Sequence, residues 1–289
     1  MIRRSGTEVK LLVAAAALMW KPTRMRSLLA GLGPADIRTE PFPHIVAYSA
    51  MPDSDYRSLS EGCPGFSRIG WVCTPERVPD NRRFPMSAHT IVSADDLPEI
   101  WRRFAALHSD ATFFAEIVRL FEGYWPAALL RAVNGDLAGQ RTGRLELAGS
   151  GEAPPIRLDA RIEINTPVRK APSSVRGPHL DTLNRIFSCL FYLRHPEDDS
   201  VGGDLVLYRW RNGPVAPIDL FSLPEESVEP VVTIPYEANR LVIFPQSIGS
   251  IHGVSIRHPT PHTRRYVFIT AELSENWLSL AGENDACAS

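Results

Sequence analysis

Ile156-Arg-Leu-Asp-Ala-Arg-Ile-Glu-Ile-Asn165 is the stretch in which the pattern of this chain changes most clearly. Apolar residues alternate with charged or polar ones, which is the period of a β-strand with one apolar and one polar face. Five further strands are predicted downstream, at residues 185–193, 204–210, 230–234, 240–244 and 265–273. Six short strands bounded by Gly, Pro and Asn predict a sandwich or jelly roll rather than a parallel sheet.

Upstream of this strand the chain is mixed. Residues 43–48 are predicted to form a short strand and residues 52–59 a brief helix, whereas the Pro- and Arg-rich residues 75–90 are typical of a loop. Ser93, followed by Asp95 and Asp96, predicts the start of one amphipathic helix. Ser109 and Asp110 predict the start of a second. These helices are expected to support a sheet.

The change of period defines the expected domain organisation. We expect an N-terminal extension over residues 1–40 that is poorly ordered, and a mixed and helical support region over residues 41–150. Residues 151–278 form the expected β-domain, and residues 279–289 a C-terminal tail.

Composition places the chain among soluble globular proteins. Its 289 residues are 44% hydrophobic and 22% charged, with a formal net charge of −2. A charge this close to zero gives no reason to expect nucleic acid or an anionic membrane as a partner. We therefore predict neither, and leave the oligomeric state open.

The N-terminus allows two readings. Arg3, Arg4 and Lys10 precede an apolar stretch at residues 11–20, which is the order found in a secretory signal. Basic residues follow at once, however, and the stretch is too short to span a bilayer. We expect a cytoplasmic protein and keep export as the alternative. Met19 and Met25 are also possible starts, so it stays open whether the first 25 or so residues belong to the protein.

The four cysteines do not form a metal-binding pattern. Cys63, Cys73, Cys189 and Cys287 show no Cys-x-x-Cys spacing. Cys189 lies in an apolar run and is predicted to be a buried thiol. Cys63 and Cys73 could pair in an oxidising compartment, but free thiols in a reducing one are favoured.

A metal-ligand pattern stands at Gly177-Pro-His-Leu-Asp181 and, far downstream, at His252. Alternate residues of an extended segment share a face, so His179 and Asp181 can offer adjacent ligands. A distant His completes the two-His, one-carboxylate set that holds Fe(II) and leaves positions open for substrate and oxygen. The alternative is that these are ordinary polar residues of a β-sandwich.

Several short sequence motifs follow this pattern along the chain: Phe191-Tyr-Leu193, Gly202-Gly-Asp-Leu205, Asn239-Arg-Leu-Val-Ile-Phe-Pro245, His252-Gly-Val254 and Arg265-Tyr266. Together they resemble the 2-oxoglutarate- and Fe(II)-dependent dioxygenases, especially the prolyl 4-hydroxylase-like branch. The resemblance covers residues 156–275, and a weaker similarity is found at Pro41-Phe-Pro-His-Ile-Val46. It implies a fold that is mainly β with supporting helices, built as a double-stranded β-helix (a cupin-like jelly roll).

The resemblance also implies roles for individual residues. His179, Asp181 and His252 would bind Fe(II) and form the catalytic centre. Arg265 would pair with the distal carboxylate of 2-oxoglutarate, and Tyr192 would offer its phenol to the same carboxylate. The interval from His252 to Arg265 is longer than is usual in the family, so Arg264 competes with Arg265 for this role.

Some polar residues keep two interpretations. Asn165 and Asn184 either face the pocket or are structural, with the structural role favoured. The Arg82-Arg83 pair either clamps an acidic substrate or is simply solvated, as most exposed loop arginines are.

The implied activity is that of an oxidoreductase. A dioxygenase of this kind would use Fe(II), 2-oxoglutarate and O2 to hydroxylate an unactivated C–H bond of a small molecule, such as an amino acid or a secondary metabolite, releasing succinate and CO2. Two alternatives are a hydroxylase of protein or peptide side chains and a non-catalytic metal-binding β-barrel that acts as a sensor or binding module. The sequence leaves open the substrate and the choice between hydroxylation, desaturation and cyclisation.

Overall fold

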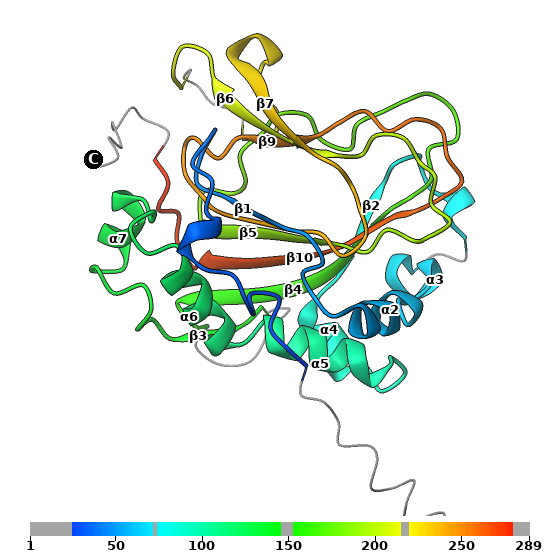
Figure 1. The fold of residues 1–289 in the computed structure, drawn as a ribbon, viewed down its shortest axis with the longest axis horizontal. Helices are drawn as coiled ribbons and strands as arrows, with labels where there is room; N and C mark the ends of the chain where they lie inside the picture. Colours follow the sequence, from blue (N-terminus) through cyan, green and yellow to red (C-terminus); the bar gives the residue numbers. More distant parts are fainter. Residues whose placement is uncertain (1–24, 72–73, 146–152, 215–219, 280–289) are drawn as a thin grey trace, which may run out of the picture.

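The computed structural model describes residues 25–71, 74–145, 153–214 and 220–279, which form two facing β-sheets with helices on one side (Figure 1). The larger sheet has the strand order β1-β8-β5-β10-β4-β2, with β3 parallel to β4. Its strands are β1 (Ile45–Ala47), β2 (Arg83–Met86), β3 (Thr142–Arg144), β4 (Ile156–Asn165), β5 (Arg185–Tyr192), β8 (Leu241–Pro245) and β10 (Arg264–Leu273). The smaller sheet has the order β7-β6-β9, from β6 (Leu205–Trp210), β7 (Val228–Ile234) and β9 (His252–Val254).

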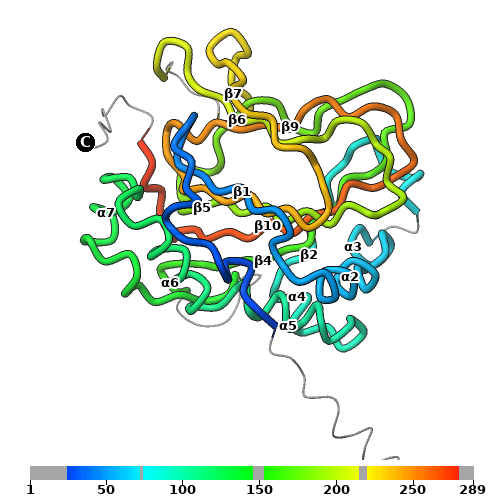
Figure 2. The backbone as a smooth tube through the Cα atoms, in the orientation of Figure 1, coloured from blue at the N-terminus to red at the C-terminus, as the bar shows by residue number. Residues whose placement is uncertain are grey.

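The helices pack on the outer face of the larger sheet, away from the smaller one (Figures 1 and 2). They are α2 (Asp53–Glu61), α3 (Phe66–Gly70), α4 (Ala88–Ser93), α5 (Glu99–His108), α6 (Ala111–Leu120) and α7 (Ala127–Ala132), with short 3-10 helices at Pro34–Asp36, Pro75–Arg77 and Glu225–Ser227. Trp101, Phe104 and His108 of α5 are buried against this face, at the three- and four-residue spacing of an amphipathic helix.

The larger sheet is buried on both faces because it separates two apolar cores. Along β10, Val267 and Ile269 belong to the core under the helices, whereas Tyr266 and Phe268 belong to a second core shared with the smaller sheet. Tyr192 of β5 lies in the same second core. The face of the larger sheet that meets the smaller sheet is called the inner face below.

The strand predicted from the opening stretch is confirmed as β4, with the predicted bounds. Three of its five polar residues do not face solvent. Asp159, Glu163 and Asn165 are all buried. Glu163 lies opposite Tyr266 in the β4–β10 register and accepts a hydrogen bond from its hydroxyl. The polar half of the alternation therefore lines the space between the two sheets.

Two predictions upstream were wrong. Residues 75–90 are not a loop, because Arg83–Met86 pairs with β4 as an edge strand, where Pro85 is tolerated. Ser93 is the last residue of α4 rather than the cap of the next helix. A helix that began after Ser93 would have Pro98 in its interior, where proline lacks the backbone donor that a helix needs. The next helix, α5, therefore begins only at Glu99, directly after Pro98. Asp110 does cap α6, accepting from Thr112 N at 2.7 Å.

The described end of the N-terminal extension is packed on the domain. Leu28 and Leu29 are buried in the core under the helices, and Leu28 N donates to His108 Nε2 at 3.1 Å. Residues 11–20 lie outside the described part of the chain, as do Cys73 and Cys287, whereas Cys63 and Cys189 are free thiols. Within the described ranges, no helix has the length and apolar character to cross a membrane.

Candidate metal centre

The two histidines of the predicted centre meet where the segment before Asp181 runs beside β9. His179 N donates to His252 O at 2.9 Å, and His252 N donates to His179 O at 3.1 Å. Gly253 permits this close approach, since a Cβ there would lie 2.7 Å from the Gly177 carbonyl oxygen. The pairing places the two imidazole rings 4.3 Å apart between centroids.

Asp181 completes the cluster, as the sequence predicts. One ligand atom from each of His179, Asp181 and His252 lies within 4.8 Å of the others. The imidazole Nε2 atoms are 4.0 Å (His179) and 3.8 Å (His252) from the two carboxylate oxygens of Asp181. All three side chains are buried, at about 5% exposure. The chain thus brings two imidazoles and one carboxylate around a common point.

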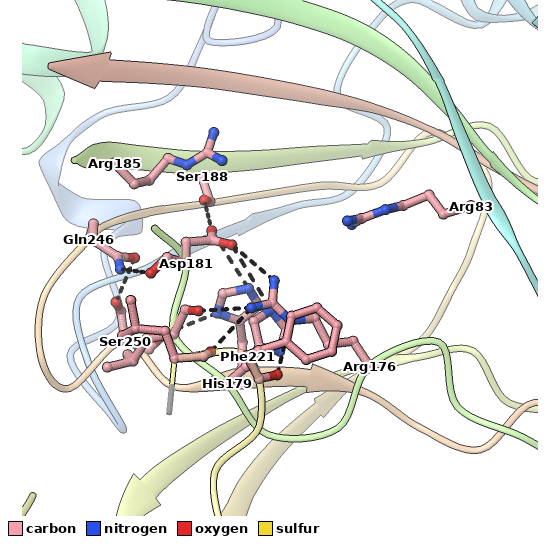
Figure 3. A network of polar contacts seen from close by, with 12 residues as sticks. Arg83, Arg176, His179, Asp181, Arg185, Ser188, Phe221, Gln246 and Ser250 are labelled. Atoms are coloured by element: carbon pink, nitrogen blue, oxygen red, sulfur yellow. Dashed lines mark hydrogen bonds and ion pairs between the residues drawn. The ribbon is translucent and has the colours of Figure 1, made fainter. Parts of the chain in front are cut away.

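Hydrogen bonds fix the orientation of the two imidazole rings and of the Asp181 carboxylate. His179 Nδ1 is 2.8 Å from Gly177 O and His252 Nδ1 is 3.0 Å from Ser250 O. A carbonyl can only accept, so each Nδ1 carries the proton and each Nε2 keeps its lone pair for a metal. The Ser188 hydroxyl donates to Asp181 Oδ2. Figure 3 shows the contact between Ser188 and Asp181, with Gln246 linking the Asp181 main chain to Ser250.

The protonation states suit a cation. Burial lowers the pKa of both imidazoles, so they are neutral near pH 7. Burial raises the pKa of the Asp181 carboxyl, but the nearby imidazoles, Arg185 and the Ser188 hydroxyl outweigh burial and hold it well below its ordinary value. Two neutral imidazoles and one carboxylate, preset by outer hydrogen bonds, are the donor set that Fe(II) takes with positions left open.

The two adjacent arginines on β10 lie on opposite faces of the sheet. Arg265 is on the helix side, where its cation is close enough to oppose the burial that raises the pKa of Cys63. Arg264 is on the inner face and buried, with its guanidinium carbon 4.7–5.1 Å from the ring centroids of Tyr192, Tyr236 and Tyr266. Of the two predicted candidates, only Arg264 lies on the inner face with Tyr192, the face toward the smaller sheet that carries His252.

Arg264 is part of a buried polar group with unsatisfied atoms. Its Nε donates to Gly203 O at 2.9 Å, but Nη2 has no hydrogen-bond partner among the described residues. The Tyr192 hydroxyl and both side-chain polar atoms of Asn165 are likewise buried and unpaired within that part of the chain. Asn165 lies directly opposite Arg264 in the β4–β10 register. Unpaired buried polar atoms are costly, so their grouping favours a polar ligand.

Ser188 and Gln246, which position Asp181, are not among the residues predicted from the sequence. For Ser188 a signal exists: it stands two and four residues before the inner-face residues Leu190 and Tyr192, as the polar member of an apolar run. Gln246 directly follows β8 and has no comparable signal.

The fold and this centre together define a β-rich protein with a two-His, one-carboxylate metal site. Residues 170–270 match the family model described as the 2OG-Fe(II) oxygenase superfamily, and the matched segment contains all three ligand residues. This match and the ligand set together indicate an oxidoreductase and imply Fe(II) and 2-oxoglutarate as its cofactor and cosubstrate. No curated protein sequence matches the chain.

Solved structures similar to the chain include a prolyl-4-hydroxylase from Pseudomonas putida, at 14% identity, covering 85% of this chain and 95% of that one with a TM-score of 0.42. Another is an oxidoreductase of the 2OG-Fe(II) oxygenase family from Burkholderia pseudomallei, at 14% identity, covering 83% and 88% with a TM-score of 0.39. A third is the epimerase SnoN of nogalamycin biosynthesis, at 11% identity, covering 80% and 78% with a TM-score of 0.44. Scores at this level say nothing about the substrate of this chain.

Proposed function

We propose that the chain is a 2-oxoglutarate- and Fe(II)-dependent hydroxylase that acts on an unactivated C–H bond of a small molecule. The observation that carries the proposal is the convergence of His179, Asp181 and His252, with each Nε2 atom presented by a fixed Nδ1–carbonyl hydrogen bond. When bound there, iron supplies the oxidising power, and the protein contributes ligands, orientation and exclusion of water.

The strand connections support a double-stranded β-helix. The inner four strands of the larger sheet run β8-β5-β10-β4. The segment 173–181 extends the smaller sheet beyond β9, through bridges from Ser173 to Arg257 and from His179 to His252. The smaller sheet then also has four members, in the order β7, β6, β9 and segment 173–181. Two facing sheets of four antiparallel strands are the arrangement of a jelly roll.

Arg264 is the proposed anchor for 2-oxoglutarate, with Tyr192 and Asn165 beside it. A guanidinium can pair with a carboxylate through two parallel hydrogen bonds, and the free Nη2 atom of Arg264 is available for one of them. The phenol of Tyr192 and the amide of Asn165 can satisfy the remaining lone pairs. Burial raises the pKa of Tyr192, so its hydroxyl stays a donor at neutral pH.

A small substrate fits the setting of the site. The three ligand residues are nearly inaccessible to solvent, and the Arg176 guanidinium lies beside Asp181 with Nη1 at 3.8 Å from Oδ1. Arg176 also stacks on the ring of Phe221, with 4.8 Å from its guanidinium carbon to the ring centroid. These two side chains lie beside the centre in Figure 3, and the deep burial of the ligand residues favours a small molecule over a folded protein as substrate.

Conversion of 2-oxoglutarate to succinate tests the proposal. The purified protein should form succinate only when Fe(II), 2-oxoglutarate and O2 are all present, and His179→Ala should abolish the reaction. Succinate formation that survives His179→Ala would contradict the proposed centre. Iron binding without succinate formation, with every substrate offered, would instead indicate a sensor or binding module.

A further inference from the structure

A second cation on the inner face stands close to the metal ligands. Arg185 opens β5, three residues before Ser188, and therefore roughly 10 Å along the strand from the residue that holds Asp181. Figure 3 draws Arg185 and Ser188 on one side of Asp181 and Arg176 on the other. The charge of Arg185 also contributes to the low pKa of the Asp181 carboxyl.

A β-bulge turns Arg185 toward the inner face. Phe187 pairs with Ala271 and Arg185 pairs with Glu272, so Ile186 is an extra residue on β5. Without it, strict alternation from Ser188 would send Arg185 to the helix side. The guanidinium carbon of Arg185 instead lies 5.1 Å from the ring centroid of Phe268, an inner-face residue. The backbone thus departs from regular pairing at the point that brings this guanidinium inside.

The guanidinium of Arg185 is incompletely satisfied. Its side chain is only 5% exposed. Its Nη2 atom forms an ion pair with Glu272, at 3.2 Å from Oε1. Nε and Nη1 are buried without a hydrogen-bond partner in the described part of the chain. Burial lowers the pKa of Arg185 although Asp181 and Glu272 oppose this effect, so the carboxylates in place do not compensate the buried charge.

The charges of two neighbouring arginines, Arg161 and Arg83, are better compensated by carboxylates or by solvent. Arg161 is 2.7 Å from Glu163 and 3.4 Å from Asp159, and these carboxylates raise its pKa in spite of burial. Arg83 lies 3.6 Å from Glu163, and its side chain is 43% exposed. Among Arg83, Arg161 and Arg185, it is therefore Arg185 that combines deep burial with unpaired donors.

On the basis of the proposed function, we propose that Arg185 binds an oxyanion of the substrate, a carboxylate or a phosphate, through its unpaired Nε and Nη1 atoms. The oxyanion and the C–H bond to be hydroxylated then belong to one small molecule, since Arg185 and the residue that holds Asp181 are three positions apart on β5. This assigns the substrate to small organic acids, amino acids or phosphate monoesters, rather than to neutral metabolites.

Calorimetric titration of the anaerobic complex with Fe(II) and saturating 2-oxoglutarate tests this assignment. The probes are acetate, benzoate and methyl phosphate, against acetamide, benzamide and trimethyl phosphate as neutral counterparts. The visible absorption of the iron–2-oxoglutarate chelate is followed throughout, so that displacement of 2-oxoglutarate from Arg264 is distinguished from binding at Arg185. The carboxylate and phosphate arms show which oxyanion the site prefers.

The wild-type complex should bind at least one of the three anions and none of the neutral compounds. Arg185→Gln should weaken that binding by about tenfold or more, because a charge-assisted hydrogen bond is lost. Arg185→Lys should fall between the two, and Arg68→Gln, at an exposed ion pair with Asp96, should bind as the wild type does.

Three results would overturn the inference: no anion binds to the wild type, Arg185→Gln binds as tightly as the wild type, or Arg185→Gln loses the chelate absorption. The last result would show that Arg185 acts on the metal site through Asp181. Failure of the proposed function is a separate outcome, because the wild type would then show no chelate absorption before any probe is added.

Discussion

The Ser188 hydroxyl donates to Asp181 Oδ2, which lies 3.8 Å from His252 Nε2, while Oδ1 lies 4.0 Å from His179 Nε2. Partners of this kind set the orientation and basicity of a metal ligand without touching the metal. Ser188→Ala should therefore weaken Fe(II) binding by about 10- to 100-fold while the fold is retained. Anaerobic calorimetry with Fe(II) measures this, with Ser58→Ala on the exposed side of α2 as the control. Unchanged affinity would remove Ser188 from the site.

Arg264 and Arg265 offer a matched pair of substitutions on adjacent residues. Arg264→Gln should raise the KM for 2-oxoglutarate by about 10- to 100-fold, because a charge-assisted pair is replaced by a neutral amide. Arg265→Gln should change that KM far less, since its side chain lies on the helix side near Cys63. Initial rates of succinate formation give both values. A larger effect at Arg265 would restore the choice made from the sequence.

Sequence and structure agree on the metal ligands for a simple reason. The His179-x-Asp181 spacing places two ligands on one side of any extended segment, whatever the surrounding fold. The choice between Arg264 and Arg265 is different in kind, since neighbouring strand residues always face opposite sides. Which side holds the site depends on where the smaller sheet packs, and no local pattern encodes that.

Among the elements, α5 carries a titratable group in the apolar core. Burial lowers the pKa of His108 from 6.5 to about 4, and its ring is held by Phe104 O at 2.8 Å and by Leu28 N at 3.1 Å. The unfolded chain therefore binds a proton at a higher pH than the folded one. Stability is complete above the unfolded pKa and declines as the pH falls from 6.5 toward 4.

The shift corresponds to roughly 3 kcal/mol between pH 7 and pH 4. His108→Gln should be less stable than the wild type at pH 7 but should lose less stability on acidification. Urea unfolding at pH 7, 6 and 5 measures both free energies. Equal pH dependence in the two proteins would show that His108 is not the group responsible.

The long strands were predicted from the sequence, as were the short strands β1 and β8, whereas β2, β3 and β9 were missed. β4 and β10 have ten residues each, enough for a period of two to be visible. β3 and β9 have three residues each, which is too few for a pattern. The bulge at Ile186 was also invisible, because it exists only relative to the partner strand β10. The inward position of Arg185 could therefore not be predicted.

At the scale of the molecule, the helices cover one face of the larger sheet and leave the other face to enclose the polar interior (Figure 1). That interior holds the metal ligands, Arg264 and Arg185, each buried with lone pairs or donors available for a ligand. Such groups are costly to bury unpaired. The ligand-free protein should therefore gain stability when its ligands bind.

Fe(II) added without oxygen should raise the free energy of unfolding by about 2.7 kcal/mol at a free concentration one hundred times its dissociation constant. The effect should vanish in His252→Ala, which lacks one ligand. Chemical denaturation with and without metal measures it. A gain of the same size in His252→Ala would indicate that iron binds elsewhere on the protein.

The central claim, an iron centre with a 2-oxoglutarate pocket, is tested most directly by visible absorption of the protein under anaerobic conditions. Addition of Fe(II) and 2-oxoglutarate should produce the weak charge-transfer absorption of the chelate, and Asp181→Ala should abolish it. Absence of this absorption in the wild type at saturating ligand, or equal absorption in Asp181→Ala, would contradict the account.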